Sequence, residues 1–154
     1  MGLGAWVLVA AVVAALALGA WRASTNGVFR GTHPVGRVAG DAAPVSTSST
    51  DGVSLLAGTS YDAQRGERAT LLQFSSAFCA PCRATRRTLA EVADEVPGVT
   101  HVEIDAEHHL ELVRALGVLR TPTTLVLDGD GRELVRATGA PRRAQVLSAL
   151  AGGL

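Results

Sequence analysis

Residues 71–83 read Leu-Leu-Gln-Phe-Ser-Ser-Ala-Phe-Cys-Ala-Pro-Cys-Arg, and a strand pattern gives way to a helix pattern within this stretch. The run from Ala69 to Ser75 is short and apolar and follows a polar turn, which indicates a buried strand. Apolar residues at helical spacing follow from Ala80 to Val96, where Pro97-Gly98 ends the pattern. Cys79 is therefore expected where a strand has ended and a helix begins.

A helix start supplies the chemistry of this cysteine. Unpaired backbone N–H groups and the helix dipole favour negative charge there, so they stabilise a thiolate at Cys79. The thiolate is the species that attacks a disulfide. Cys82 is expected about one helical turn further along, within reach of the first sulfur, and Pro81 fits the first turn. The chain has two cysteines, so a disulfide within it must join this pair.

Strand and helix patterns continue towards the C-terminus. They predict a strand over 99–104, a helix over 107–116, strands over 123–127 and 132–138 around an Asp-Gly-Asp-Gly turn, and a helix over 141–150. Together with the first strand and helix, the order is β-α-β-α-β-β-α. This order predicts an α/β fold with a central mixed β-sheet flanked by helices.

The N-terminal stretch is predicted to be a transmembrane helix over residues 1–21. Gly2 to Trp21 contains no charged residue, and about 20 apolar residues span a bilayer. Arg22, Arg30 and Arg37 follow it, so the positive-inside rule predicts a single-pass protein of the cell membrane with a cytoplasmic catalytic domain. The alternative is a signal peptide cleaved near Ala17-Leu18-Gly19, which would make the domain extracytoplasmic or secreted.

Two further segments complete the predicted organisation. Residues 22–52 are rich in Ser, Thr, Gly, Ala and Pro and poor in large apolar side chains, which predicts a flexible linker. Residues 53–154 are predicted to form the catalytic domain.

The net charge and the positions of the histidines argue against two classes of function, nucleic-acid binding and metal binding. The formal net charge of the 154 residues is zero, so no global attraction to nucleic acid is expected. Cys79 and Cys82 could form half of a zinc site with His101, His108 or His109, but the predicted elements do not bring these histidines together. We therefore expect no metal.

Two motifs resemble the thioredoxin family. Residues 71–83 resemble its active-site segment, and Gly-Val-Leu-Arg-Thr-Pro-Thr-Thr-Leu at 117–125 resembles the segment around its cis-proline. The resemblance covers about residues 55–150 and includes the Asp-Gly hairpin. It implies a thioredoxin-like fold in which a cis Thr121–Pro122 peptide bond lies beside the cysteine pair.

The resemblance also implies a function. Cys79 and Cys82 would be catalytic and would reduce protein disulfides, with no cofactor, using an electron donor such as a thioredoxin reductase. The Thr121 backbone would bind an extended substrate chain by strand addition. The implied substrate-binding residues are Phe78, Ala80, Pro81, Thr121, Pro122 and Gly139.

The chain departs from the family pattern beneath the cysteines. Gln73 stands where the family usually has a buried Asp, and His101 stands where it often has a Lys. Gln cannot accept a proton, so we expect a slower resolving step or a relay through His101 or water. The alternative is that His101 is a strand histidine with no part in catalysis.

Two other functions remain open. An extracytoplasmic disulfide oxidase or isomerase would use the same two sulfurs at a different reduction potential. A non-catalytic binding module on a thioredoxin scaffold would not need an intact cysteine pair.

Overall fold

In the part of the chain that the structure describes, five strands form one mixed sheet in the order β1-β5-β4-β2-β3. The computed structural model describes residues 3–25, 27–31 and 54–153. The elements are α1 (Leu3–Thr25), β1 (Phe29–Gly31), η1 (Asp62–Gln64), β2 (Ala69–Ser75), α2 (Ala80–Glu95), β3 (Val99–Asp105), α3 (Leu110–Ala115), β4 (Thr123–Asp128), β5 (Glu133–Thr138) and α4 (Arg143–Gly153). From β2 onward this is the predicted order, so the α/β prediction is confirmed.

The sheet separates two apolar cores. β2 pairs with β3 in parallel, whereas β4 pairs antiparallel with both β2 and β5. Because side chains alternate along a strand, Leu71 packs with Leu89 of α2 and Val146 of α4, whereas Leu72 and Phe74 pack on the opposite face. The same alternation places Gln73 on the face that α2 covers.

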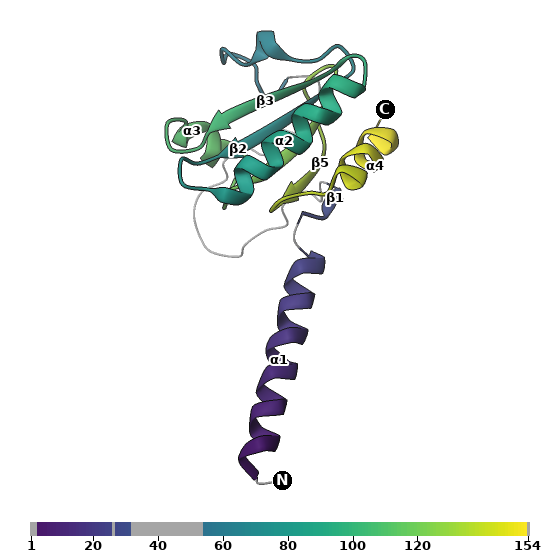
Figure 1. The fold of residues 1–154 in the computed structure, drawn as a ribbon. Helices are drawn as coiled ribbons and strands as arrows, with labels where there is room; N and C mark the ends of the chain where they lie inside the picture. Colours follow the sequence, from purple (N-terminus) through teal and green to yellow (C-terminus); the bar gives the residue numbers. More distant parts are fainter. Residues whose placement is uncertain (1–2, 26, 32–53, 154) are drawn as a thin grey trace, which may run out of the picture.

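The N-terminal helix differs from its prediction. α1 forms over Leu3–Thr25 and extends away from the sheet, and its described side chains, residues 6–22, are exposed (Figure 1). Among the residues that the structure describes, no helix combines the length and the apolar character that crossing a bilayer requires. The predicted transmembrane helix over residues 1–21 is therefore corrected: a helix forms there, but it does not meet these requirements for a membrane span.

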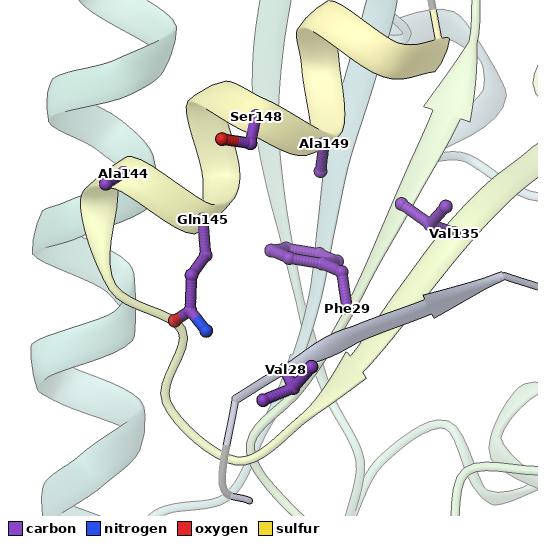
Figure 2. Close-up of a pocket in the computed structure, with 7 residues that line it drawn as sticks. All are labelled: Val28, Phe29, Val135, Ala144, Gln145, Ser148 and Ala149. Atoms are coloured by element: carbon purple, nitrogen blue, oxygen red, sulfur yellow. The ribbon is translucent and has the colours of Figure 1, made fainter. Parts of the chain in front are cut away.

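The predicted linker is also wrong at its start. Residues 22–25 belong to α1, and Phe29–Gly31 form β1, which pairs antiparallel with β5. Phe29 explains why: its ring lies between Val135 of β5 and Ala149 of α4, at the floor of an apolar groove of about 380 Å³ (Figure 2). One aromatic side chain and a backbone ladder thus order this short segment. Residues 32–52 of the predicted linker lie outside the described residues.

The stretch before β2 packs without a long helix. Its regular structure is η1, three residues long. Leu56 is fully buried in the core that contains Phe74. Arg65 Nε donates to Asp62 Oδ1 at 2.8 Å, and its Nη1 donates to the carbonyl of Gly129 at 2.5 Å. These bonds tie the stretch to the β4–β5 turn.

Two helices begin later than predicted, and side-chain bonds explain both shifts. The Asp105 carboxylate accepts from the Glu107 amide at 2.8 Å, so a turn precedes α3. The Arg142 amide donates to Gln145 Oε1 at 2.8 Å, and α4 begins at Arg143 instead of Pro141.

Candidate active site

The cysteine pair lies at the N-terminus of α2. Cys79 is the residue that caps this helix, and its Sγ accepts a hydrogen bond from the Cys82 amide at 3.1 Å. The two sulfurs are joined in a disulfide, with the Cα atoms 5.2 Å apart. Pro81 lies in the first turn, where its missing N–H leaves no bond unmade. The predicted placement at a strand–helix junction is confirmed.

The two sulfur-bearing residues differ in exposure. Cys79 is 9% exposed and Cys82 is 2% exposed. Next to them, Phe78 is fully exposed, and Ala80 and Pro81 are also at the surface. A partner molecule therefore reaches Cys79 first, while Cys82 lies beneath it.

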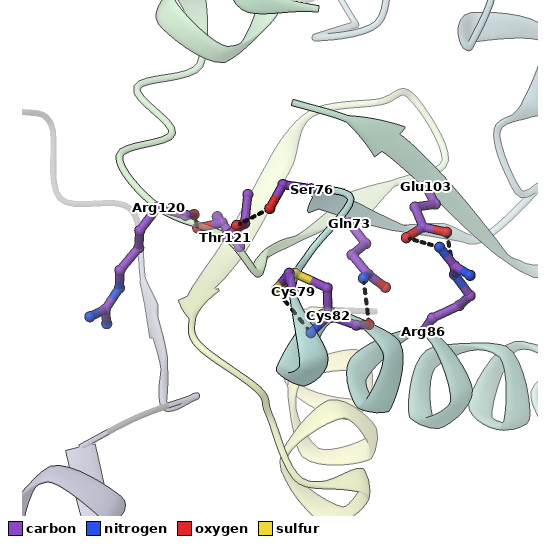
Figure 3. Close-up of a disulfide and its surroundings, with 9 residues drawn as sticks. Gln73, Ser76, Cys79, Cys82, Arg86, Glu103, Arg120 and Thr121 are labelled. Carbon is purple, nitrogen blue, oxygen red and sulfur yellow. Dashed lines mark hydrogen bonds and ion pairs between the residues drawn. A yellow bond between two sulfur atoms is a disulfide. The ribbon is translucent and has the colours of Figure 1, made fainter. Parts of the chain in front are cut away.

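The Thr121–Pro122 peptide bond is cis, as the resemblance implied. Pro122 is buried, and β4 begins directly after it. The hydroxyls of Ser76 and Thr121 lie 3.1 Å apart and share a hydrogen bond (Figure 3). Ser76 lies in the loop between β2 and α2 that carries Cys79, which we call the cysteine loop. The bond therefore holds the loop that contains Thr121 and Pro122, the cis-proline loop, against the cysteine loop.

Gly139 supports the other side of the cis-proline loop. Its φ of +92° belongs to the left-handed region, where glycine is unstrained. In this conformation its amide donates to the carbonyl of Pro122 at 2.8 Å. Gly139 thus positions Pro122 through the backbone.

A buried amide links the cysteine helix to β3. Gln73 is fully buried, and its Nε2 donates to the carbonyl of Cys82 at 3.0 Å. Because a carbonyl only accepts, the amide oxygen must face the other way, where it lies 3.2 Å from His101 Nε2. His101 therefore carries its proton on Nε2. The structure brings both residues of the expected relay together beneath Cys82.

His101, Glu103 and Arg86 form a corner of the site, and their charges influence one another's pKa values. Burial lowers the pKa of His101, the Glu103 charge opposes this, and the Arg86 charge lowers the pKa further. Burial would raise the pKa of Glu103, but hydrogen bonds from Arg86 and Ser75, together with the charges of Arg86 and His101, outweigh it and lower that pKa. Arg86 holds Glu103 through bonds of 2.5 and 2.8 Å. The corner favours a neutral imidazole beside an ionised carboxylate.

A polar pocket of about 320 Å³ reaches Cys82 from this corner. Figure 3 shows Arg86 and Glu103 on this side of the disulfide and Thr121 on the other. The pocket is lined by Ser75, Ser76, Ala77, Cys82, Arg83, Arg86, Glu103 and Asp105. It offers water a route to the less exposed sulfur.

The histidines considered for a zinc site lie apart. His101 contacts Gln73, His108 Nδ1 lies 2.9 Å from Asp105 Oδ2, and His109 Nε2 lies 3.1 Å from the Tyr61 hydroxyl. Within the described ranges, no three metal-ligating side chains gather.

Sequence reasoning missed three residues around the disulfide. Leu119, next to the cis-proline loop in sequence, is 94% exposed, although its neighbour Val118 is buried. The Arg120 guanidinium donates to Thr138 Oγ1 at 2.9 Å, and Ser76 bonds to Thr121. The sequence carries no signal for the Arg120–Thr138 and Ser76–Thr121 bonds, because each joins segments that only the tertiary fold brings together. It carries none for the exposure of Leu119 either.

A family model described as a thioredoxin-like domain matches residues 61–152. The chain belongs to the thioredoxin family. Thioredoxin-2 of Pyricularia oryzae is 30% identical over 87 residues, covering 56% of this chain and 50% of that protein. An H-type thioredoxin of Oryza sativa subsp. indica is 28% identical over 78 residues, covering 51% and 63%. The chain thus spans between half and about two thirds of these curated relatives.

The thioredoxin fold is also found in the structural comparison. The X-ray structure of Fasciola hepatica thioredoxin matches with a TM-score of 0.52 and 23% identity, covering 61% of this chain and 88% of that one. At this identity the likeness shows the shared fold.

Proposed function

We propose that this thioredoxin-family chain is a thiol–disulfide oxidoreductase that reduces disulfides in other proteins. The observation that carries the proposal is the Cys79–Cys82 disulfide at the N-terminus of α2, with Cys79 as the capping residue. The family membership supports it, since relatives are named thioredoxins.

The first step begins from the reduced pair. The Cys79 thiolate attacks one sulfur of a partner disulfide, forms a mixed disulfide and releases one partner thiolate. The Cys82 amide, which lies 3.1 Å from Cys79 Sγ, stabilises the negative charge before attack. The greater exposure of Cys79 makes it the attacking residue.

The second step releases the product. The Cys82 thiolate attacks Cys79 Sγ, which forms the disulfide seen in the structure and expels the second partner thiolate. Two electrons pass to the partner, whose two thiolates take up protons. The chain is then reduced again by an external electron donor, for which a thioredoxin reductase is the proposed class.

The Cys82 proton must leave through its surroundings. Gln73 holds the Cys82 carbonyl but cannot accept a proton. We assign the acceptor role to water in the polar pocket beside Cys82. His101 is linked to Cys82 through the Gln73 amide, and burial lowers its pKa and keeps it neutral. Gln73 is then a positioning residue.

The substrate surface surrounds Cys79. Phe78 and Leu119 expose their side chains almost completely, and they flank the disulfide and the cis-proline loop. Such exposed apolar side chains suit contact with an apolar protein segment. The substrate backbone would run along Thr121, which precedes β4, with Ala80, Pro81, Pro122 and Gly139 shaping the site.

A trapping experiment tests the proposal. Cys82→Ser removes the resolving sulfur, so we expect mixed disulfides between Cys79 and partner proteins. These should appear as bands on a non-reducing gel and disappear when a reducing agent is added. The matched control is Cys79→Ser with Cys82 retained, which should trap far less because Cys82 is covered. Failure of Cys82→Ser to trap any protein would favour a binding module without turnover.

A redox titration separates the reductase from the oxidase. A potential near that of thioredoxin, about −270 mV, supports reduction of partner proteins. A potential near about −120 mV would instead assign an oxidising role.

A further inference from the structure

Thr85 has a buried hydroxyl without a hydrogen-bond partner. Its side chain lies on α2 and is fully buried, and among the described residues no group bonds to its Oγ1. A buried hydroxyl without a partner costs free energy, and folded proteins retain few of them. The hydroxyl of Thr85 therefore calls for a physical explanation.

The usual partner of a helical threonine is not used here. A threonine hydroxyl within a helix commonly bonds to the carbonyl three or four residues earlier. For Thr85 these are the carbonyls of Cys82 and Pro81. The Cys82 carbonyl accepts from Gln73 Nε2 at 3.0 Å instead (Figure 3). Thr85 thus keeps its hydroxyl unpaired beside the turn that carries Cys82, the resolving cysteine.

Thr85 lies one helical turn after Cys82 on the same buried face. The buried residues of α2 are Cys82, Thr85, Leu89 and Val92, and a spacing of three and four residues follows one side of a helix. Helical side chains lean towards the N-terminus, so the Thr85 side chain covers the turn that contains Cys82. Because Leu89 and Val92 are apolar, Cys82 is the neighbour in this row that can hydrogen-bond to Thr85.

Two fully buried polar side chains lie on the sheet face that α2 covers. Gln73 belongs to β2, and Thr124 of β4 lies directly opposite it on the same face. Both ends of the Gln73 amide are engaged, one with the Cys82 carbonyl and one with His101. The Thr124 hydroxyl is unpartnered among the described residues and does not bond to Thr85. Of Gln73, Thr124 and Cys82, Cys82 alone changes its hydrogen-bonding capacity when the disulfide is reduced.

We propose that the Thr85 hydroxyl pairs with Cys82 Sγ once the disulfide is reduced. This inference rests on the proposed redox function. Reduction breaks the bond between the two sulfurs and adds one hydrogen to each, while two thiols of the reductant become a disulfide. The Cys82 side chain is then free to rotate, and its sulfur is a thiol that donates or a thiolate that accepts. The hydroxyl without a partner in the disulfide form gains one in the dithiol form.

Such a hydrogen bond favours the dithiol form of the chain. A group that pairs in one redox state alone stabilises that state, and a more stable reduced form makes the disulfide a stronger oxidant. Thr85 therefore raises the reduction potential of the cysteine pair. A hydroxyl that donates to the Cys82 thiolate also favours formation of this thiolate, which is the species that attacks Cys79 Sγ in the second step.

Equilibration of the full-length chain with a glutathione redox buffer tests the proposal. Thr85→Val keeps the shape of the side chain and removes the hydroxyl, so the equilibrium constant for reduction should fall about 3- to 10-fold. A tenfold fall is about 30 mV towards more negative potentials for this two-electron couple. Thr85→Ser keeps the hydroxyl and should retain the constant of the unaltered chain. Thr124→Val, the matched loss of a buried unpartnered hydroxyl on β4, should leave the constant unchanged.

The same titration gives the outcomes that contradict the proposal. An unchanged constant for Thr85→Val overturns it, and so does a larger shift for Thr124→Val than for Thr85→Val. In both cases the chain still cycles between disulfide and dithiol, so the proposed function stands. A disulfide that glutathione cannot reduce would overturn the proposed function together with the role of Thr85.

Urea denaturation in both redox states separates this role from a purely structural one. Thr85→Val should lower the free energy of unfolding of the reduced chain but not of the oxidised chain. Thr70→Val is the control, because Thr70 Oγ1 accepts from the Gly66 amide at 3.1 Å at the end of β2 away from the cysteines. It should destabilise both redox states equally. Equal changes in the two states for Thr85→Val would overturn the proposal.

Discussion

Gln73 is a fully buried polar residue of β2, and its surroundings explain why it is tolerated. Both ends of its amide are used, one by the Cys82 carbonyl and the other by His101. Buried polar groups are stable when they are paired and costly when they are not. The contrast between Gln73 and Thr85, a buried residue whose hydroxyl has no partner in the described part of the chain, makes this testable.

We expect Gln73→Met to lower the free energy of unfolding by about 2 kcal/mol, because the Cys82 carbonyl and His101 Nε2 would lose their buried partner. Thr85→Val replaces a buried hydroxyl that has no bond to lose with a methyl group of similar size, so the free energy of unfolding should be unchanged or higher. Urea denaturation of the oxidised protein measures both. Equal destabilisation by the two changes would contradict the role given to Gln73.

Phe78 and Leu119 expose apolar side chains beside the cysteines, which predicts a role in holding protein substrates. The double change Phe78→Ser, Leu119→Ser should raise KM for a protein disulfide about 10-fold, corresponding to about 1.4 kcal/mol of binding. Reactivity with a small-molecule disulfide should stay the same, since the sulfurs are untouched. Trp6→Ser, an exposed aromatic residue on α1, is the control and should change neither rate.

At the scale of elements, the junction between β2 and α2 creates the site. β2 ends at Ser75 and α2 begins at Ala80, so the cysteine loop is four residues long and is held at both ends. The cis-proline loop leads directly into β4, and the hydrogen bond between Thr121 and Ser76 joins it to the cysteine loop. Three elements thus meet at one disulfide.

β1 is the element whose contribution is least expected from its sequence. We expect Phe29→Ala to lower the free energy of unfolding by about 1–2 kcal/mol, less than for a fully buried Phe, because the ring is half-buried between β5 and α4. Val28→Ala, at an exposed neighbouring residue, should have little effect. Thermal unfolding measures both. No loss for Phe29→Ala would mean that β1 does not stabilise the domain.

For the whole molecule, the corner around His101 links stability to pH. The pKa of His101 in the folded protein is lowered from 6.5, mainly by burial, so the folded state binds this proton less tightly than the unfolded state does. Its contribution is fully present above pH 6.5 and is lost as pH falls through the folded pKa. The pKa of Glu103 is lowered from 4.5, so its contribution is lost only in more acidic solution.

We therefore expect the free energy of unfolding to fall between about pH 7 and about pH 5.5, and His101→Gln to reduce that fall. Urea denaturation at the two pH values, with the disulfide intact, provides the comparison. A variant with the same pH dependence as the unaltered chain would show that another group is responsible.

Much of the fold could be predicted because its signals are local. The apolar run of β2, the helical spacing of α2 and the Asp-Gly turn each depend on neighbouring residues, and all three elements formed as expected. The secondary structure before residue 32 was predicted less well. Their composition suggested a membrane span and a linker, whereas the structure has α1 followed by β1, which β5 and α4 order.

The sequence alone determined that two sulfurs would stand at a helix start, because Cys-x-x-Cys spacing and a strand–helix junction are properties of adjacent residues. It also located the cis Thr121–Pro122 bond through its resemblance to known proteins. Only the tertiary structure decided what surrounds the sulfurs: the Gln73–His101 contact and the Ser76–Thr121 bond. These join residues far apart in the chain, and their pairing depends on sheet order and register, which local patterns do not encode.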